Sequence, residues 1–330
     1  MSIVDGISIV IPNYNGGVLL PQILPPAIAA LTNTGLPYEI IVADDCSTDD
    51  SVNLLHEKFP EVKSIANEKN SGFSVTANKG IRAAQYTWVL LLNSDVKLEP
   101  GYFQSLLKYT NNPGVFGVMG RIIGWEDDIV QDGAKYPFFH GVKIKTSGNY
   151  LLKDKSQMKG GLYSMYVSGA NAFLNKEIFL SIGGFNEMFS PFYAEDTELS
   201  FRAWRLGYIC LYEYNAICRH RTSSTIANTR KKKQVNIIYN RNKMYLHAIH
   251  LDFPDNFLWF LQMLFEVLAR IILLKFDYAK SFFLFIKNYG EVKRSRTILR
   301  QLAINRKLLS IRQVFNKITD SIKDENITRF

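Results

Sequence analysis

Four short apolar runs, separated by segments of helical length, dominate the first hundred residues of the chain. The runs are rich in Ile, Val and Leu, as strands buried on both faces of a parallel sheet are. They cover 7–12, 39–44, 62–67 and 88–92, and the segments between them cover 19–32, 49–58 and 74–85. Strands that alternate with helices predict an α/β domain with a mostly parallel sheet.

Polar residues follow each of these runs at the point where the strand is expected to end. They are Asn13 and Asn15 after the first run, Asp44 and Asp45 at the second, Asn70 and Gly72 after the third, and Asn93, Ser94 and Asp95 at the fourth. In an open α/β sheet the ligand crevice lies beyond the carboxyl ends of the strands. We therefore expect all four groups to meet at one edge and to form the ligand site.

The composition of this edge predicts the kind of ligand. The turn after the first run, residues 12–17, reads PNYNGG, which fits neither a dinucleotide-binding glycine pattern nor a Walker-type loop. Carboxylates crowd the edge instead, and they repel a diphosphate unless a divalent cation lies between them. Because hard oxygen ligands suit Mg²⁺ or Mn²⁺, the pattern predicts a nucleotide-diphosphate site with Mg²⁺ or Mn²⁺ as cofactor.

A series of motifs, in sequence order, resembles the family 2 glycosyltransferases of the GT-A fold. The motifs are SIVIPNYN at 8–15, DDCSTD at 44–49, NSGF at 70–73, NKG at 78–80, LNSD at 92–95, SGAN at 168–171, GGFNE at 183–187, EDTELSFR at 195–202, and His220. The resemblance covers about residues 5–250, and bacterial rhamnosyltransferase-like members are the most similar. It implies a nucleotide-diphospho-sugar transferase fold.

The resemblance also implies an activity. It is the transfer of one sugar, with inversion, from a UDP- or dTDP-sugar to a hydroxyl of a glycan or lipid-linked glycan in cell-surface polysaccharide synthesis. The Gln-x-x-Arg-Trp motif of processive synthases is absent from the sequence, which favours single-sugar addition. Two alternatives stay open at this point: a sugar-nucleotide nucleotidyltransferase, and a non-catalytic sugar-nucleotide-binding scaffold.

The donor-binding roles come from the resemblance. It assigns them to Pro12, Asn13, Asn15, Asp44, Asp45, Asn70, Gly72, Asn78, Asn93 and Ser94. For the two aspartates the alternative is a cap on the following helix. Asn78 has the alternative of facing solvent. A helix N-terminus after Gly72 would suit phosphate or ribose contact.

The metal ligands implied by the resemblance are Asp95 and His220. Asn93 replaces the first acid of the Asp-x-Asp metal motif, so Asp95 is the one charged ligand there. We expect weak metal binding without nucleotide, because the diphosphate has to complete the coordination shell. Arg219 and Arg221 flank His220 and could meet phosphate charge. A structural role for His220 is the alternative.

The resemblance makes Asp196 the catalytic base, with Glu195 in support. Inverting transfer needs a base for the acceptor hydroxyl, and a metal-bound diphosphate leaves without a separate acid. Acids favoured at a helix start are the alternative. Acceptor-binding residues by resemblance are Gly169, Ala170, Asn171 and Trp204, although Trp204 could equally be a core residue.

The charge of the chain is uneven. Residues 1–228 carry 19 Lys and Arg against 22 Asp and Glu, whereas residues 229–330 carry 20 against 8. We expect a catalytic domain at 1–228, with a donor half at about 1–120 and an acceptor half at about 121–228. Residues 229–330 are expected to form a basic, amphipathic helical region.

The apolar stretches 257–274 and 276–289 carry regularly spaced polar residues, such as Gln262, Glu266 and Arg270 in the first. This favours interfacial helices on an anionic membrane over membrane spans. A helical bundle or a homodimer interface is the alternative, and the absence of a nucleic-acid module argues against nucleic acid.

The three cysteines, Cys46, Cys210 and Cys218, have no disulfide or metal spacing, and no basic segment precedes an apolar one at the N-terminus. We therefore expect a cytoplasmic protein, peripheral on the inner face of the cell membrane.

Overall fold

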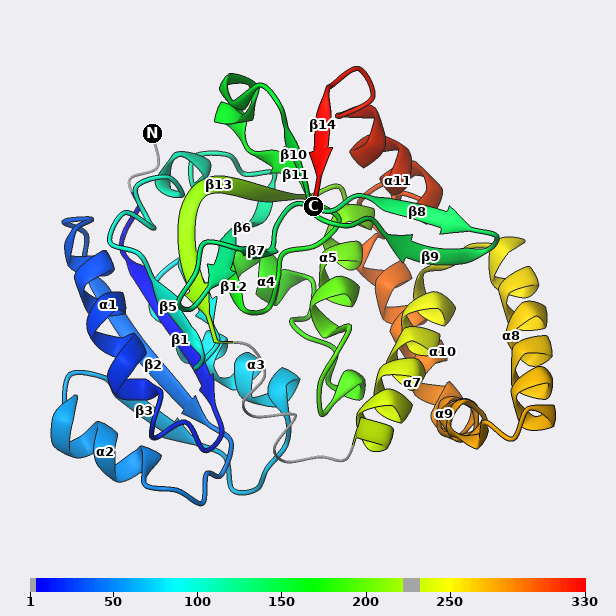
Figure 1. The fold of residues 1–330 in the computed structure, drawn as a ribbon, viewed down its shortest axis with the longest axis horizontal. Helices are drawn as coiled ribbons and strands as arrows, with labels where there is room; N and C mark the ends of the chain where they lie inside the picture. Colours follow the sequence, from blue (N-terminus) through cyan, green and yellow to red (C-terminus); the bar gives the residue numbers. More distant parts are fainter. Residues whose placement is uncertain (1–3, 222–231) are drawn as a thin grey trace.

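The structure, a computed structural model, describes residues 4–221 and 232–330, and a ten-stranded sheet lies at its centre (Figure 1). The strand order is β11-β13-β6-β12-β4-β1-β2-β3, with β5 paired to β13 and β7 paired to β6. The strands of this sheet are β1 (Ile7–Asn13), β2 (Tyr38–Asp44), β3 (Lys63–Ala66), β4 (Trp88–Leu92), β5 (Val96–Leu98), β6 (Val115–Gly124), β7 (Val130–Asp132), β11 (Leu162–Tyr163), β12 (Asn171–Asn175) and β13 (Ile209–His220).

Helices cover both faces of the sheet and form the C-terminal region. They are α1 (Leu20–Thr32), α2 (Ser51–Lys58), α3 (Phe73–Ala83), α4 (Lys176–Ser181), α5 (Glu195–Arg205), α7 (Lys232–His250), α8 (Asp255–Ile272), α9 (Phe276–Lys287), α10 (Tyr289–Leu302) and α11 (Ile311–Asp320). Short 3₁₀ turns lie at Leu107–Tyr109, Lys155–Gly160 and Glu187–Phe189. The predicted α/β class with a C-terminal helical extension is confirmed.

The first half of the sheet is parallel. Strand β1 pairs in parallel with β2 and β4, and β2 pairs in parallel with β3. The register places Asn13 opposite Asp44, and Asp44 opposite Ala66. The carboxyl ends of these strands therefore lie at one edge, as the sequence predicted.

The second half of the sheet is mixed and brings later segments to the same edge. Strand β12 lies antiparallel between β4 and β6, with Asn171 opposite Leu92. Strand β13 runs parallel to β6 and pairs antiparallel with β5, where Val96 is opposite His220. This register places the end of β13 next to Asp95.

The core follows the alternation of side chains along the strands. Val10 and Ile41 pack with Ile81 of α3 in one cluster, whereas Ile9 packs with Ile23 of α1 in the other. Each such fully buried aliphatic side chain stabilises the fold by about 1.5–3 kcal/mol. Two packed faces hold the sheet edge in a fixed position.

The C-terminal helices share the first of these cores. The short strand β14 (Ile327–Arg329) pairs with β10 (Tyr150–Leu152). The guanidinium of Arg205, on α5, donates to the carbonyls of His250 and Leu309 and pairs with Asp252 at 2.7 Å. A hairpin of β8 (Pro137–His140) and β9 (Lys143–Thr146) lies near α8 (Figure 1). The C-terminal region is thus packed into the rest of the chain.

Two sequence predictions concern this region directly. The predicted boundary between residues 228 and 229 falls within 222–231, outside the described residues. Within the described ranges, none of the helices has the length and apolar character needed to span a bilayer.

Candidate donor and transfer site

The loops after β1 and β2 are joined by side chains that the sequence placed at the strand ends. The Asn13 amide donates to Oδ1 of Asp44 at 2.8 Å, and the Ser47 hydroxyl donates to the same oxygen at 2.6 Å. The Asn15 side-chain oxygen accepts from the Thr48 amide at 2.8 Å. Asn15 has a left-handed φ of 55°, a conformation that Asn tolerates. The two loops therefore form one rigid wall.

Asp45 joins the loop that opens α3 to this wall. Its Oδ1 accepts from the Ser71 amide and its Oδ2 accepts from the Gly72 amide, both at 2.8 Å. Asn67 also donates to Oδ1 at 2.8 Å. Both carboxylate oxygens thus hold backbone N–H groups, so Asp45 organises the third loop of the site. A contact between Asp45 and the donor base stays a prediction, as does one from Asn70, which is exposed.

Gly72 links the loop that opens α3 to residues 190–194, which precede the predicted catalytic base Asp196. Its φ is 88°, and a Cβ atom there would lie 2.8 Å from the Cα atom of Pro191. The Phe73 amide donates to the Pro191 carbonyl at 3.1 Å. A side chain at position 72 would therefore push the 190–194 segment away from the site.

The Asn93-Ser94-Asp95 turn lies where β4, β12 and β13 meet. The backbone N–H of Asn93 donates to the Ala170 carbonyl at 3.0 Å. Ser94 lies beside the Gly16 turn that follows β1. Asp95 Oδ2 is 3.6 Å from Nε2 of His220. The structure thus brings together residues of the predicted donor, acceptor and metal groups.

The His220 ring is oriented by Gln131, a residue that the sequence did not single out. Gln131 Oε1 lies 2.7 Å from His220 Nδ1, and its Nε2 donates to the His220 carbonyl at 3.3 Å. The second contact fixes which way the Gln131 amide points, so Nδ1 of His220 carries a proton and Nε2 is the ring atom that faces Asp95. In the tautomer with the proton on Nδ1 alone, the Nε2 lone pair would be available to a cation beside Asp95.

A divalent cation fits these residues. Asp95 Oδ1 is buried and has no hydrogen-bond partner among the described residues, which leaves a carboxylate oxygen available to an ion. Residues 4–221 and 232–330 contain no group of three or more His, Cys, Asp and Glu that could hold a metal. If a cation binds at Asp95 and His220, the diphosphate and water would have to complete its coordination shell.

Asp196 lies at the start of α5 and faces the loop before β12. Its Oδ2 accepts from the Gly169 amide at 3.3 Å, and its Oδ1 accepts from the Thr197 amide at 2.6 Å. Burial raises the pKa of Asp196 above its ordinary value, and the nearby charge of Asp132 adds to this effect. An aspartate with a raised pKa is better matched to accepting a proton near neutral pH.

Glu195 is the neighbour of Asp196, and the charge of Asp196 affects its protonation. Burial, and then the charge of Asp196, raise the pKa of Glu195 to about 8. Its Oε2 has no hydrogen-bond partner within the described part of the chain. Tyr193 and Ala194, directly before it, have φ values of 78° and 67°. Two successive left-handed non-glycine residues are costly and are typical of functional segments.

Asn242 of α7 holds this strained segment in place. The buried Asn242 amide donates to the carbonyls of Phe189, Phe192 and Tyr193 at 2.6–2.9 Å. Arg241 donates to the Ser190 carbonyl at 2.6 Å. This role could not be predicted from the sequence, because Asn242 lies more than 45 residues beyond the predicted catalytic base and belongs to no motif.

A second unpredicted group lies close to Asp196. Lys135 pairs with Asp132 and donates to the Tyr166 hydroxyl at 2.9 Å, and that hydroxyl lies 3.4 Å from Asp132 Oδ1. These three residues belong to no recognisable motif in the sequence. Their side chains bring hydrogen-bonding groups close to Asp196.

Three residues with predicted ligand contacts are buried in the structure. Asn78 is fully buried, and its amide is saturated by the Phe185 backbone and Glu187. Asn171 is also fully buried and donates to the Gly120 carbonyl at 3.1 Å. Trp204 is fully buried, with its indole N–H donating to the Ser164 carbonyl at 3.0 Å. These side chains organise the core and cannot stack on or bind a sugar in this conformation.

The fold and this strand-end site together define a glycosyltransferase of the GT-A type. Residues 8–183 match the model of glycosyl transferase family 2, and the chain belongs to that family. This membership favours a glycosyltransferase over the nucleotidyltransferase alternative.

Curated relatives are similar over about two thirds of the chain. An N-acetylglucosaminyl-diphospho-decaprenol L-rhamnosyltransferase of Mycobacterium tuberculosis is 24% identical over 67% of this chain and 78% of its own length. An O-antigen chain rhamnosyltransferase of Salmonella anatum is 27% identical over 64% of this chain and 65% of its own. Chondroitin synthase of Escherichia coli is 28% identical over 62% of this chain, which spans only 33% of that protein.

Solved structures share the fold at low identity. GalNAc-T7 with UDP, GalNAc and Mn²⁺ superposes with a TM-score of 0.66 at 14% identity, over 98% of this chain and 58% of that one. A mannosyltransferase from Pyrobaculum calidifontis with GDP-Man and Mn²⁺ gives a TM-score of 0.53 at 14% identity, over 98% and 86%.

Proposed function

We propose that this glycosyltransferase moves one sugar, with inversion, from a UDP- or dTDP-sugar to a hydroxyl of a glycan or lipid-linked glycan. The observation that carries the proposal is the loop of Gly169 and Ala170. It contacts the Asp196 carboxylate at one residue and the Asn93 amide at the next. A single loop therefore links the base to the turn that carries Asp95, at the place where a donor diphosphate would lie.

The chemistry is a single displacement at the anomeric carbon. Asp196 accepts the proton of the acceptor hydroxyl as the new carbon–oxygen bond forms, and the bond to the nucleoside diphosphate breaks on the opposite side. The Gly169 and Thr197 amides orient the Asp196 carboxylate for that proton. A protonated Glu195 beside it avoids two adjacent negative charges.

Asp95 and His220 would hold the cation, with Gln131 fixing the His220 ring. When bound, Mg²⁺ or Mn²⁺ stabilises negative charge on the leaving diphosphate. One solved structure of similar fold contains Mn²⁺ and UDP, and another contains Mn²⁺ and GDP-Man, which supports a divalent cation and a nucleotide-sugar donor.

The names of two relatives support an acceptor that is delivered at a membrane. One relative is named as acting on a decaprenol-linked diphosphate sugar, and another as adding rhamnose to O-antigen chains. We extend this to cell-surface polysaccharide synthesis by a cytoplasmic enzyme, peripheral on the inner face of the cell membrane. A homodimer through the C-terminal helices is the competing use of that region.

The donor is tested by incubating the full chain with a panel of UDP-, dTDP- and GDP-sugars, with Mn²⁺ or Mg²⁺. We expect slow release of nucleoside diphosphate from one UDP- or dTDP-sugar, and a raised melting temperature with that donor plus metal. The absence of both effects with every donor would contradict the proposal. If the chain used only a GDP-sugar, the proposed nucleotide would be wrong, but the proposed class of reaction would stand.

A further inference from the structure

Helix α8 is apolar on two opposite faces. Trp259, Met263 and Val267 are spaced four residues apart and are buried. Phe265, Leu268 and Ile272 lie about half a turn away on the helix and are 73%, 58% and 79% exposed. Phe257, Leu258 and Leu261 extend the same outward face toward the start of the helix and are also exposed. A helix at a water-facing surface is expected to be polar there.

The polar residues of α8 face the protein instead. Glu266 pairs with Lys143 of β9 and accepts from the Tyr278 hydroxyl at 3.2 Å. Gln262 donates to Glu266 at 3.0 Å. The guanidinium of Arg270 lies 3.7 Å from the centre of the Tyr278 ring. The polar stripe predicted from the sequence is therefore used internally, and the apolar face points outward.

The outward apolar surface continues through the turn into α9. Leu273, Leu274 and Phe276 are all more than half exposed, and Leu274 has a left-handed φ of 57°. Phe283 and Ile286 of α9 are exposed as well. The surface made by the outward residues of α8, this turn and α9 is here called the α8–α9 face.

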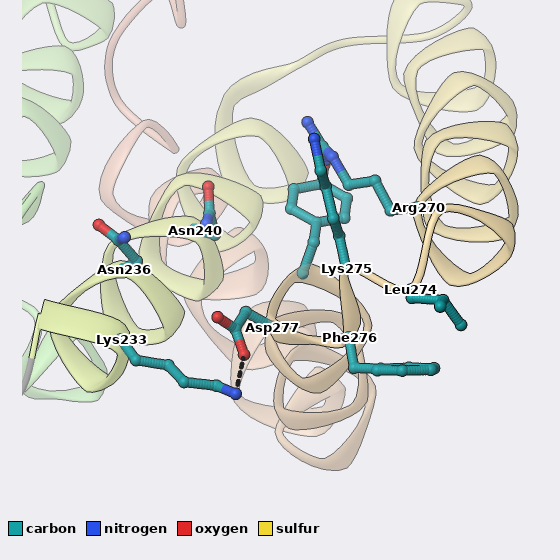
Figure 2. Close-up of a pocket in the computed structure, with 9 residues that line it drawn as sticks. Lys233, Asn236, Asn240, Arg270, Leu274, Lys275, Phe276 and Asp277 are labelled. Atoms are coloured by element: carbon teal, nitrogen blue, oxygen red, sulfur yellow. Dashed lines mark ion pairs between the residues drawn. The ribbon is translucent and has the colours of Figure 1, made fainter.

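A basic pocket of about 440 Å³ lies beside the α8–α9 face, between α7, α8 and α9 (Figure 2). Arg270 and Lys275 extend in the same direction from the end of α8, whereas Leu274 and Phe276 point away from them (Figure 2). Among the described residues that line the pocket, Asp277 is the one carboxylate, and it pairs with Lys233 at 3.1 Å. The lining side chains thus carry three positive charges and one negative charge, and Arg270 also lies 3.5 Å from Glu266 Oε2.

We propose that the α8–α9 face docks on an anionic lipid bilayer and that the pocket binds one anionic lipid headgroup. The outward apolar residues enter the acyl region, while Arg270 and Lys275 bind the headgroup phosphate. Exposed Lys280 and Lys287 on α9 add positive charge beside the face. A second copy of the chain fits less well, because residues 229–330 carry 20 Lys and Arg against 8 Asp and Glu and would repel each other.

Membrane docking does not itself depend on the proposed function. The link between docking and a lipid-linked acceptor does rest on the proposed function.

The test is co-sedimentation of the full chain with neutral phosphatidylcholine vesicles and with vesicles containing about 30% phosphatidylglycerol. We expect binding to the anionic vesicles, at least tenfold stronger than to the neutral ones. Equal binding to both, or binding to neither, would overturn the proposal.

Two variants separate the face from the pocket. Phe265→Glu changes an outward side chain and should weaken vesicle binding about tenfold or more. Lys275→Glu changes the pocket and should weaken binding to anionic vesicles by about tenfold, with little effect on neutral ones. Ile304→Glu is the matched control, since Ile304 is 77% exposed but lies outside the α8–α9 face, and it should bind as the parent does.

Two further readouts identify the occupant. Inorganic phosphate at millimolar concentration should displace little protein from vesicles. Thermal stabilisation by phosphate without vesicle binding would overturn the lipid assignment. Light scattering tests whether the chain forms dimers at high concentration. If it does, if Phe265→Glu abolishes the dimers, and if the parent does not bind vesicles, the α8–α9 face would be assigned to a second copy of the chain.

Donor hydrolysis, measured without vesicles, keeps this proposal apart from the proposed function. Phe265→Glu should retain the parent's rate. Vesicle binding by a parent chain that hydrolyses no donor would reject the proposed function and support the membrane face.

Discussion

The Nε2 atom of His220 lies 3.6 Å from the Oδ2 atom of Asp95, although the two residues are far apart in the sequence. Strand pairing causes this proximity, because β5 and β13 place Val96 opposite His220. Gln131 then orients the ring so that Nε2 faces the carboxylate. The two predicted metal ligands are thus brought together by sheet register, and a hydrogen bond from Gln131 orients one of them.

Gln131→Leu should weaken Mn²⁺ binding in the presence of nucleotide about tenfold, because an unsupported ring loses its fixed tautomer and orientation. Nucleotide affinity without metal should stay the same. Mn²⁺ titration followed by electron paramagnetic resonance measures the first quantity, and calorimetry measures the second. Gln104→Leu, at an exposed position, is the control. Unchanged Mn²⁺ affinity in Gln131→Leu would remove Gln131 from the site.

Asp196→Asn should lower the rate of sugar transfer by about 10²–10⁴-fold, the usual contribution of a general base. Donor affinity should change less than threefold, because the neutral amide has nearly the same size. Transfer is followed by release of nucleoside diphosphate, and donor affinity by calorimetry. Turnover close to that of the parent would move the base to another residue, with Glu195 the first candidate.

Glu195→Gln should change how stability depends on pH. The pKa of Glu195 is raised to about 8 from an ordinary value of 4.5, so the folded protein binds the extra proton between these pH values. The stabilisation linked to that proton is complete below pH 4.5 and is lost as pH rises toward 8.

The variant cannot ionise at this position, so its stability relative to the parent should rise between pH 5 and pH 8. The slope should reach at most about 1.4 kcal/mol per pH unit. Urea unfolding across this range measures it. Parallel pH profiles for the two proteins would show that Glu195 has an ordinary pKa.

Asn242→Ala should lower the free energy of unfolding by about 1–3 kcal/mol, because three carbonyls lose a buried donor. It should also lower kcat, since the segment before Glu195 loses its support, while donor affinity falls less. Asn236→Ala, an exposed position on the same helix, is the matched control. A stability loss with kcat unchanged would make Asn242 a packing residue only.

The strand ends could be predicted because they depend on local pattern. The apolar runs and the polar residues after them are adjacent in sequence, and parallel strands bring their carboxyl ends to one edge. The start of α5 at Glu195 was predictable for the same reason.

Features that depend on distant partners could not be predicted. Asn78 and Trp204 looked available to a ligand, but their polar atoms bind backbone groups more than 35 residues away. The inward polar stripe of α8 depends on Lys143 and Tyr278, which only the folded chain places beside Glu266. Gln131 became recognisable only once β13 had placed His220 next to it.

Binding of Mn²⁺ to the full chain, with and without UDP or dTDP, tests the central claim most directly, and electron paramagnetic resonance reports the free ion. We expect weak binding without nucleotide, binding at least about tenfold tighter with it, and loss of the nucleotide effect in Asp95→Ala and His220→Ala. Equal affinity with and without nucleotide, or a nucleotide effect that survives in both variants, would contradict a metal site shared between these two residues and the donor diphosphate.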